Sequence, residues 1–392
     1  MRVLYFGTYS VGAGYPRNTV LIESLRSVGV EVHECHVPLF GGPSQKIAAA
    51  TTLRGALWYG LRAATAWLRL GARFFTAGPR DVVVVGYTGH LDLFLARTLS
   101  TFTRRPLVLD AFLSPYDTIV GDRALLHPHS CAARALFHFE RASLHLADRV
   151  LTDTQAGAEF LARTFGLPLS RCVAVPVGSL VRGPVLTRRR TPVAARLSPG
   201  GDVLTLPPPA PFRVLFAGSF VPLQGLPYIL DAAAAAPEID FRIVGDGPDG
   251  PQVEQEVRER GLSNVDLVRR FMTRTELEGF MTEADAVLGV FGTAPKTARV
   301  IPCKVYDGLA AGRAVVTGDT PAARELLTDG EDALLVDRSD PGSLAAALRR
   351  LRDEAGLRDR LRRNARRLAH RSFSPEAIGM LLRGALQELV QT

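Results

Sequence analysis

A short segment late in the chain gathers cationic side chains that could bind an anion. The sequence contains three lysines, and two of them, Lys296 and Lys304, lie close together with Arg299 between them. Pro302 and Gly312 predict the first residue and the stop of a short helix, which places Lys304 in the first turn. Free N–H groups at a helix N-terminus, with three nearby cations, suit a diphosphate. A basic surface loop is the alternative.

The scarcity of lysine favours the functional interpretation. Lys and Arg together number 47, so a solvated surface cation in this chain would more often be arginine. Asp307 comes three residues after Lys304 and projects from the same face of the predicted helix, with Val305 between them. The sequence therefore predicts Lys296, Arg299 and Lys304 as catalytic cations, and Val305 and Asp307 as contacts of the bound ligand.

Two carboxylates follow a predicted strand in the first half of the chain. Asp110 ends the strand, and Asp117 comes shortly after it, beside Ser114. The carboxylates and nearby hydroxyl groups at this strand end are candidates for ligand binding, whereas Asp117 could equally cap a helix. The run from His127 to Cys131 offers three metal-type side chains without a fourth ligand, so no metal site is predicted.

A glycine-containing loop follows the first predicted strand. Gly12 and Gly14 form a GxG that could let the backbone approach a phosphate, although the third glycine of a dinucleotide fingerprint is missing. Glu34 lies at about the distance expected for a ribose-binding acid, so a nicotinamide enzyme is an open alternative at this loop. A glycine-permitted turn without a ligand is the other.

Strands and helices alternate along the whole chain, which is typical of α/β domains with parallel sheets covered on both faces. The predicted organisation is two doubly wound domains that face a central cleft: residues 1–178, a linker at 179–211, residues 212–372, and a C-terminal helix at 373–392 that crosses back to the first domain. The predicted strands cover residues 3–6, 30–37, 82–86, 107–112, 150–153, 173–177, 214–218, 241–245, 265–268, 286–291, 314–317 and 333–336.

Composition limits the classes of function. Hydrophobic residues make up 47% and charged residues 22%, without a run of about twenty uncharged apolar residues or a signal-peptide pattern, so a cytoplasmic protein is expected. The four cysteines have no CxxC spacing. The net charge of +8 comes from dispersed arginines without interleaved aromatics, so nucleic acid is not an expected partner. An anionic membrane surface or a phosphorylated substrate explains the charge as well.

Five segments of the second half resemble the GT-B glycosyltransferases, specifically the large retaining "group 1" family that uses nucleotide sugars. Their order and spacing carry the resemblance, which covers essentially the whole second domain. The segments are Phe216 to Gly225, Val244 to Pro248, Pro302 to Gly312 with the following Ala-Val-Val, Pro321 to Glu325, and Gly330 to Val336 followed by Asp340 and Pro341.

The resemblance assigns donor-binding roles in the second domain and also marks departures from the family pattern. Asp307 takes the place of the second glutamate of the family's Glu-(seven residues)-Glu motif, which holds the nucleotide ribose, whereas Arg299 stands where the first glutamate is expected. Ser219 and Gln224 stand where many members carry arginine and lysine. The implied donor contacts in the second domain are Gly218, Ser219, Gln224, Gly245, Val305, Asp307 and Glu325.

The resemblance implies an enzyme that transfers a hexose from a nucleoside diphosphate sugar to a hydroxyl acceptor with retention, without a metal or other cofactor. The departing phosphate takes the acceptor proton, and Asp110 or Asp117 orients the sugar or the acceptor. The acceptor is a cell-envelope glycan, a glycolipid or a secondary metabolite. A nucleotide-sugar epimerase and a non-catalytic subunit that binds a nucleotide sugar or a lipid surface are the alternatives.

The segment from Thr51 to Phe75 is a candidate membrane-docking helix that would place the protein at the inner face of the cell membrane. A basic amphipathic helix with tryptophan is typical of an interfacial segment. The alternative is a covering helix whose leucine face packs on the sheet and whose arginines are solvated. One face of the expected helix carries Arg54, Arg62, Arg69 and Arg73, with Trp58 beside them. Another face carries Leu53, Leu57, Leu61, Trp67 and Leu68.

Overall fold

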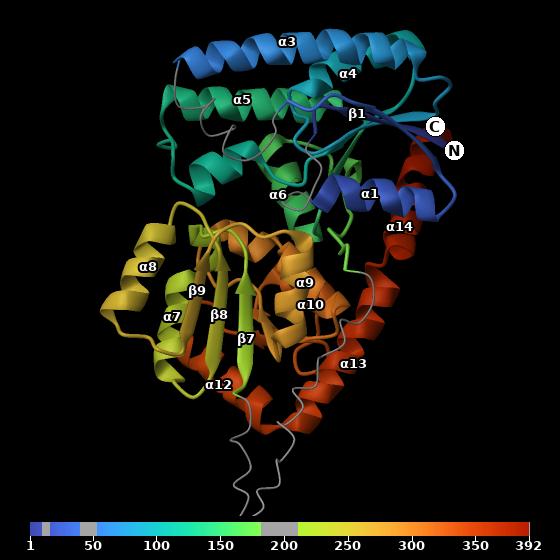
Figure 1. The fold of residues 1–392 in the computed structure, drawn as a ribbon. Coiled ribbons are helices and arrows are strands. Elements are labelled where there is room, and N and C mark those ends of the chain that lie inside the picture. The colour runs from blue at the N-terminus through green and yellow to red at the C-terminus, as the bar shows by residue number, and fades with distance from the viewer. Residues whose placement is uncertain (10–15, 40–52, 182–210, 392) are drawn as a thin grey trace, which may run out of the picture.

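The computed structural model describes residues 1–9, 16–39, 53–181 and 211–391. Two α/β domains lie one above the other in Figure 1, with the first domain at the top. Each contains a six-stranded sheet in which every strand pairing is parallel. The two doubly wound domains and all twelve predicted strands are therefore confirmed.

The first domain has the strand order β2-β1-β3-β4-β5-β6. Its strands are β1 (Arg2–Gly7), β2 (Glu31–His36), β3 (Val82–Val85), β4 (Leu107–Asp110), β5 (Arg149–Thr152) and β6 (Cys172–Ala174). Its helices are α1 (Pro16–Ser27), α3 (Leu53–Thr76), α4 (Asp92–Thr103), η1 (Asp117–Asp122), α5 (Cys131–Leu146), α6 (Gln155–Phe165) and η2 (Leu169–Arg171).

The second domain has the order β12-β11-β10-β7-β8-β9. Its strands are β7 (Arg213–Ala217), β8 (Asp240–Gly245), β9 (Val265–Arg269), β10 (Ala286–Leu288), β11 (Ala314–Gly318) and β12 (Leu334–Val336). Its helices are η3 (Pro222–Gln224), α7 (Leu226–Ala235), α8 (Gly250–Glu259), α9 (Arg274–Glu283), η4 (Pro295–Arg299), α10 (Cys303–Ala310), α11 (Pro321–Leu326), α12 (Pro341–Asp353), α13 (Ala355–Ser372) and α14 (Pro375–Gln391).

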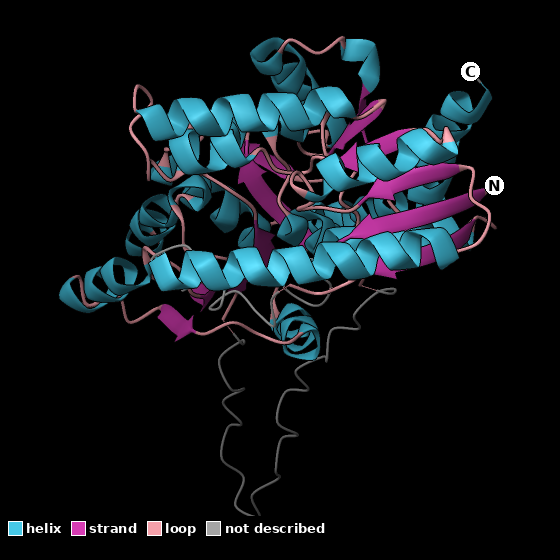
Figure 2. Ribbon diagram, turned by 90° about the horizontal axis from the view of Figure 1, so that it is seen from above, coloured by secondary structure: helices cyan, strands magenta, loops and turns pink. Residues whose placement is uncertain are grey.

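The central strands are short apolar runs because both of their faces are covered. All four residues of β3 are valine and fully buried, and the five residues of β11 are buried as well. Figure 2 shows the strands of the first domain between layers of helices. A strand buried on both faces cannot alternate apolar and polar residues, which is why continuous valine runs marked these strands in the sequence.

The strand order predicts where a ligand binds. In the second sheet the order reverses between β7 and β10, and ligands of open parallel sheets bind beyond the carboxyl ends of the strands at such a switch point. The loop after β7 holds Gly218 and Gln224, and the connection after β10 holds Lys296 and leads into α10 with Lys304. The topology therefore brings the predicted donor loop and the predicted cations to one edge.

The C-terminal helices join the two domains. Figure 1 shows α13 and α14 in red, running from the second domain up to the first. There α14 packs against α1. Arg149 of β5 donates to the Ala385 carbonyl at 2.7 Å, and Arg383 donates to the Val28 carbonyl at 3.1 Å. The last helix therefore belongs to the core of the first domain.

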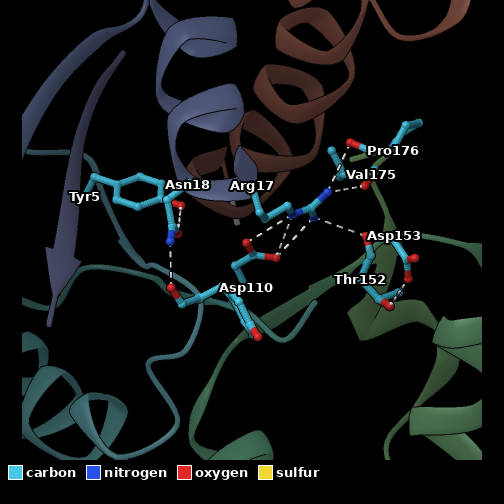
Figure 3. A network of polar contacts seen from close by, with 9 residues as sticks. Tyr5, Arg17, Asn18, Asp110, Thr152, Asp153, Val175 and Pro176 are labelled. Atoms are coloured by element: carbon cyan, nitrogen blue, oxygen red, sulfur yellow. Dashed lines mark hydrogen bonds and ion pairs between the residues drawn. The ribbon is translucent and has the colours of Figure 1, made fainter. Parts of the chain in front are cut away.

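A buried ion pair ties the strand ends of the first domain together (Figure 3). Arg17 of α1 is 1% exposed and Asp110 at the end of β4 is 0% exposed, with Nη2 and Oδ1 at 3.1 Å. Arg17 also donates to the carbonyls of Thr152, Val175 and Pro176. One guanidinium therefore holds the ends of β4 and β5 and the segment after β6.

Two local expectations differ from the structure. Pro302 is the N-cap and has extended backbone angles, so α10 begins at Cys303, one residue later than predicted. The covering face of α3 consists of Ala63, Ala66, Leu70 and Phe74, which are buried, whereas Leu61 and Leu68 are 63% and 76% exposed. The expectation that these two leucines pack on the sheet is wrong, because the helix turns the face with Leu70 and Phe74 to the core of the first domain. Within the described residues, no helix is long and apolar enough to span a bilayer.

Candidate functional site

The loop after β7 is built for close approach of the backbone. Gly245 has φ of 144°, and a Cβ there would lie 1.8 Å from the Gly218 carbonyl oxygen. A Cβ on Gly218 would in turn lie 2.9 Å from Lys304 Nζ. Only glycine suits both positions, because a side chain at either would displace the loop or the ammonium group. Glycine at position 218 thus leaves space beside the Lys304 ammonium group, and glycine at position 245 allows β8 to approach the Gly218 carbonyl.

Lys304 is held by two neutral groups of the second domain. Its Nζ donates to Gln224 Oε1 at 2.6 Å and lies 3.4 Å from the centre of the Phe216 ring. Gln224 stands where many relatives of the resembled family carry lysine, so here the cation reaches the same loop from α10.

The charge of Lys304 has no counter-ion within the described part of the chain. Its side chain is buried, and burial lowers the pKa of the ammonium group well below its usual value. None of the ion pairs formed by described residues includes it, since its partners are an amide oxygen and an aromatic face. A buried cation without an anion is costly, and a bound anion beside it would remove the cost.

Lys296 and Arg299 point to the first domain and do not join Lys304. Lys296 Nζ donates to Thr118 Oγ1 at 2.6 Å, and Arg299 Nη2 pairs with Asp117 Oδ1 at 2.6 Å. The Arg299 guanidinium also lies 4.0 Å from the centre of the Phe160 ring. The three predicted cations therefore form two groups, one at the donor loop and one across the domain interface.

The interface group borders a small cavity of about 30 Å³ between the domains. Residues from both domains line it, among them Ser114, Asp117, Asp153, Lys296 and Arg299. Burial lowers the pKa of Lys296, and the carboxylates of Asp117 and Asp122 act in the opposite direction. The predicted carboxylate Asp117 therefore lies in the cleft, where it is paired with Arg299.

Asp307 and Glu325 both contact groups outside their own domain. Asp307 Oδ1 accepts from Ser179 Oγ at 2.5 Å, and burial raises the pKa of Asp307 to about 6. Glu325 accepts from the backbone N–H groups of Gln155 and Ala156 at 2.7 Å each, where it stabilises the N-terminus of α6. In this arrangement both carboxylates help to join the domains.

The other predicted site residues lie as follows. Asp110 is occupied by Arg17 and faces the core of the first domain. Ser219 is exposed beside Gly218, whereas Val305 is fully buried and offers only its backbone to a ligand. Gly12 and Gly14 lie outside the described residues.

Sequence reasoning missed three polar groups of the interface. Thr118 and Ser179 are partners of Lys296 and Asp307, and Asp153 lines the interdomain cavity. Asp153 is the last residue of the predicted strand 150–153 and follows β5 in the structure, which is the place where ligand-binding residues of parallel sheets lie, so that signal was available. No group of three metal-ligating side chains comes together among the residues described.

Comparisons with known proteins agree with this geometry. The family model described as "Glycosyl transferase 4-like domain" matches residues 9–178, and the one described as "Glycosyl transferases group 1" matches residues 211–354. Together they cover the two domains.

Two curated relatives match part of the chain. The lipopolysaccharide core biosynthesis glycosyltransferase LpsD of Rhizobium meliloti is 32% identical over 167 residues, or 43% of this chain and 47% of that protein. The alpha-D-kanosaminyltransferase of Streptomyces kanamyceticus is 27% identical over 180 residues, or 45% of each protein. The matched region thus spans about half the length of these relatives.

Solved structures share the fold of the whole chain. Sucrose-phosphate synthase from Thermosynechococcus elongatus has a TM-score of 0.72 at 18% identity and covers 100% of this chain and 99% of its own. Anabaena HepE in complex with UDP-glucose has a TM-score of 0.65 at 17% identity and covers 99% of this chain and 100% of its own. With both domains matched by glycosyl transferase models and the two-domain architecture shared over its full length, the chain belongs to the group 1 glycosyl transferases of the GT-B fold.

Proposed function

We propose that the protein transfers a hexose from a nucleoside diphosphate sugar to a hydroxyl acceptor, with retention of configuration and without a metal. The observation that carries the proposal is the buried charge of Lys304, which lacks a counter-ion among the described residues beside the glycine-lined loop of the second domain. A diphosphate supplies the missing negative charge at the switch point of the sheet. The solved complexes of HepE with UDP and UDP-glucose support this class of donor.

Lys304 would act at the departure of the nucleoside diphosphate. Negative charge grows on the diphosphate as the glycosidic bond breaks, and a preorganised cation in a dry site stabilises that charge at this step. Gln224 orients the ammonium group by accepting a hydrogen bond from it. In a front-face reaction the leaving phosphate oxygen takes the acceptor proton, so no protein nucleophile is assigned.

Incubation with UDP-, GDP- and dTDP-hexoses, with product analysis, tests this proposal. A transferase releases free nucleoside diphosphate slowly when water replaces the acceptor. An epimerase instead isomerises the sugar without releasing the nucleotide, and a non-catalytic binding subunit changes neither. Isomerisation without release, or tight binding without turnover for every donor, contradicts the proposal.

We further propose that the acceptor lies at an anionic membrane surface, where α3 docks. The outer face of α3 exposes Leu61, Leu68 and Phe75 at spacings of seven residues. Each of the two leucines is followed by an exposed arginine, Arg62 or Arg69. The helix contains no acidic residue. A helix with apolar and cationic residues together on its solvent face suits a lipid interface, where each cation contributes about 1 kcal/mol.

A hollow on the same face has room for an anionic headgroup. It measures about 290 Å³ and is lined by Trp58, Arg62, Thr65 and Arg69, with Val37 and Pro38 on the opposite side. The Arg62 guanidinium stacks on the Trp58 ring at 4.7 Å from the ring centre. The side chains of Leu53, Arg54 and Leu57 lie outside the described part of the helix.

Co-sedimentation with vesicles tests the docking proposal. The protein should bind vesicles rich in phosphatidylglycerol at low salt and ignore pure phosphatidylcholine. Changing Arg62, Arg69 and Arg73 to Gln should abolish binding. The matched control changes Arg363, Arg367 and Arg371 on the exposed side of α13, which removes the same charge from the other domain. Equal loss in both variants, or no binding by the wild type, would show that α3 is not the docking surface.

A further inference from the structure

Two buried carboxylates stand at neighbouring strand ends of the first domain, and only one of them is satisfied. Asp110 at the end of β4 receives three hydrogen bonds from Arg17. Asp153 after β5 is 4% exposed, and its Oδ1 accepts only from Thr152 Oγ1 at 3.3 Å among side-chain donors. Its Oδ2 is buried without a hydrogen-bond partner within the described residues. Figure 3 shows both carboxylates beside Arg17.

Arg17 does not supply the missing partner. Its Nε and Nη2 donate to Asp110, and Nη1 donates to the carbonyls of Val175 and Pro176. Burial raises the pKa of Asp153 to about 7, although the charge of Arg17 opposes this shift. A buried oxygen without a hydrogen-bond partner lowers the stability of the fold by about 1–3 kcal/mol. If Asp153 had no function, an apolar residue at this position would make the protein more stable.

The unsatisfied carboxylate borders the cavity between the two domains. Thr152 and Asp153 form one wall, and Lys296 and Arg299 of the second domain form another. The volume of about 30 Å³ holds about one water molecule. Because the walls belong to different domains, the volume of the cavity depends on the separation of the domains.

The position of the cavity suits the acceptor of the proposed reaction. The lining residues Lys296 and Arg299 belong to η4, and the chain leads from η4 directly into α10 with the diphosphate-binding Lys304. A carboxylate can only accept hydrogen bonds when it is ionised, so its natural partner is an O–H donor. Lys296 and Arg299 are already bound to Thr118 and Asp117, which leaves Asp153 as the lining carboxylate without such a partner.

We propose that Asp153 binds the acceptor hydroxyl that receives the sugar. The inference rests on the proposed transferase function and names the residue that positions its second substrate. Before the reaction, the carboxylate accepts a hydrogen bond from the O–H group and so positions the acceptor oxygen. In the reaction this oxygen bonds to the anomeric carbon, and its proton turns from Asp153 towards the diphosphate. The bond from that carbon to the diphosphate breaks, the proton passes to the departing phosphate oxygen, and Asp153 emerges unchanged. With water in the same place, the product is the free sugar.

Hydrolysis of the donor tests this role without a known acceptor. The variant Asp153→Asn keeps the shape of the side chain, and the control Glu159→Gln removes the same charge from a half-exposed residue of α6 that pairs with Arg163. Release of UDP from UDP-hexose should fall at least tenfold in the Asn variant, whereas its affinity for UDP, measured by calorimetry, should match the wild type. The control should retain both properties.

The pH profile of hydrolysis provides a second readout. Because only ionised Asp153 accepts the O–H hydrogen bond, hydrolysis by the wild type should decline as the pH falls through about 7, and the Asn variant should lose this decline. The groups whose charges act on or respond to Asp153 are Arg17 of α1, Glu325 of α11, Lys296 of η4, and Cys303 and Tyr306 of α10.

The outcomes separate the two proposals. If Asp153→Asn hydrolyses the donor at the same rate as the wild type, the acceptor role is contradicted. The transferase function is not affected by that result. Parallel loss of UDP affinity and hydrolysis in this variant also contradicts it, because Asp153 would then act on the donor or on the fold. If the wild type releases nucleotide from no donor sugar, the transferase function fails and the acceptor role fails with it.

Discussion

Arg17 in the first domain and Lys304 in the second are both buried cations, but their surroundings differ. Arg17 is 1% exposed and is bound by the Asp110 carboxylate and three backbone carbonyls. Lys304 is 6% exposed and has one amide oxygen and one aromatic ring. A fully paired buried charge holds a fold together, whereas a buried charge without a counter-ion indicates where a ligand of opposite charge binds.

Removing Asp110 should have the largest effect and should act on stability. Asp110→Ala leaves the Arg17 guanidinium buried without its carboxylate, which costs about 3–5 kcal/mol. Thermal unfolding should show a large fall in the melting temperature. The double change Arg17→Met with Asp110→Leu removes both charges and should recover only part of the loss, because the carbonyls of Thr152, Val175 and Pro176 lose their donor. If the single variant melts like the wild type, the pair does not hold the first domain together.

Removing Lys304 should act on turnover and leave the fold intact. Lys304→Ala should lower donor turnover about 100- to 1,000-fold, because one preorganised charge donor contributes about 3 kcal/mol to the transition state. Arg258→Ala on the exposed surface of α8 is the matched control and should be active. Near-normal turnover of a folded Lys304 variant would remove this residue from the mechanism.

The contrast with Lys296 sharpens the assignment. Lys296 binds Thr118 of the first domain, so its removal affects the domain interface and not the donor loop. We expect Lys296→Ala to reduce turnover about tenfold, the equivalent of about 1.4 kcal/mol, which is the net contribution of about one hydrogen bond. Equal losses in the two lysine variants would mean that the cations act as one group, as the sequence had suggested.

Asp307 tests whether an interdomain contact can also bind the donor. If the ribose hydroxyls replace Ser179 as its partners, Asp307→Ala should weaken UDP binding more than Asp307→Asn, since only the alanine loses every acceptor. Wild-type affinity should fall as the pH drops through about 6, because a protonated carboxyl is a poorer acceptor. The Asn variant should lack this dependence. Calorimetric titration with UDP measures both effects, and unchanged affinity in the alanine variant would separate Asp307 from the donor.

The sheets could be predicted from the sequence because their physical cause is local. A strand such as β3 is buried on both faces and must therefore be apolar throughout, which makes it visible as Val82 to Val85 without knowledge of its neighbours. The order of the segments in the second half carried the family resemblance in the same way. For α3 the periodicity identified the helix but not its buried face. The helix has one apolar face with leucines and another with alanines, and only the packing of the domain determines which of the two faces the sheet.

The arrangement of the site was less predictable because side-chain direction depends on contacts between distant segments. Spacing placed Lys296, Arg299 and Lys304 in one segment, yet the first two reach Thr118 and Asp117, which precede them by more than 170 residues. Only the three-dimensional structure shows that Gln224 and Phe216 hold Lys304. The unsatisfied oxygen of Asp153 could not be inferred from sequence at all, because an absent partner is visible only when all neighbours are placed.

Calorimetric titration with UDP tests the central claim most directly. The wild type and Lys304→Met are each titrated in two buffers of different ionisation enthalpy, so that the protons exchanged on binding can be counted. Burial lowers the pKa of Lys304 in the free protein, and a bound diphosphate should raise it again. Binding at alkaline pH should therefore take up a proton in the wild type, and its affinity should fall as the pH rises. The methionine variant should bind UDP more weakly and without proton uptake. If both proteins bind UDP with equal affinity and equal proton exchange, the diphosphate is not the missing partner of Lys304.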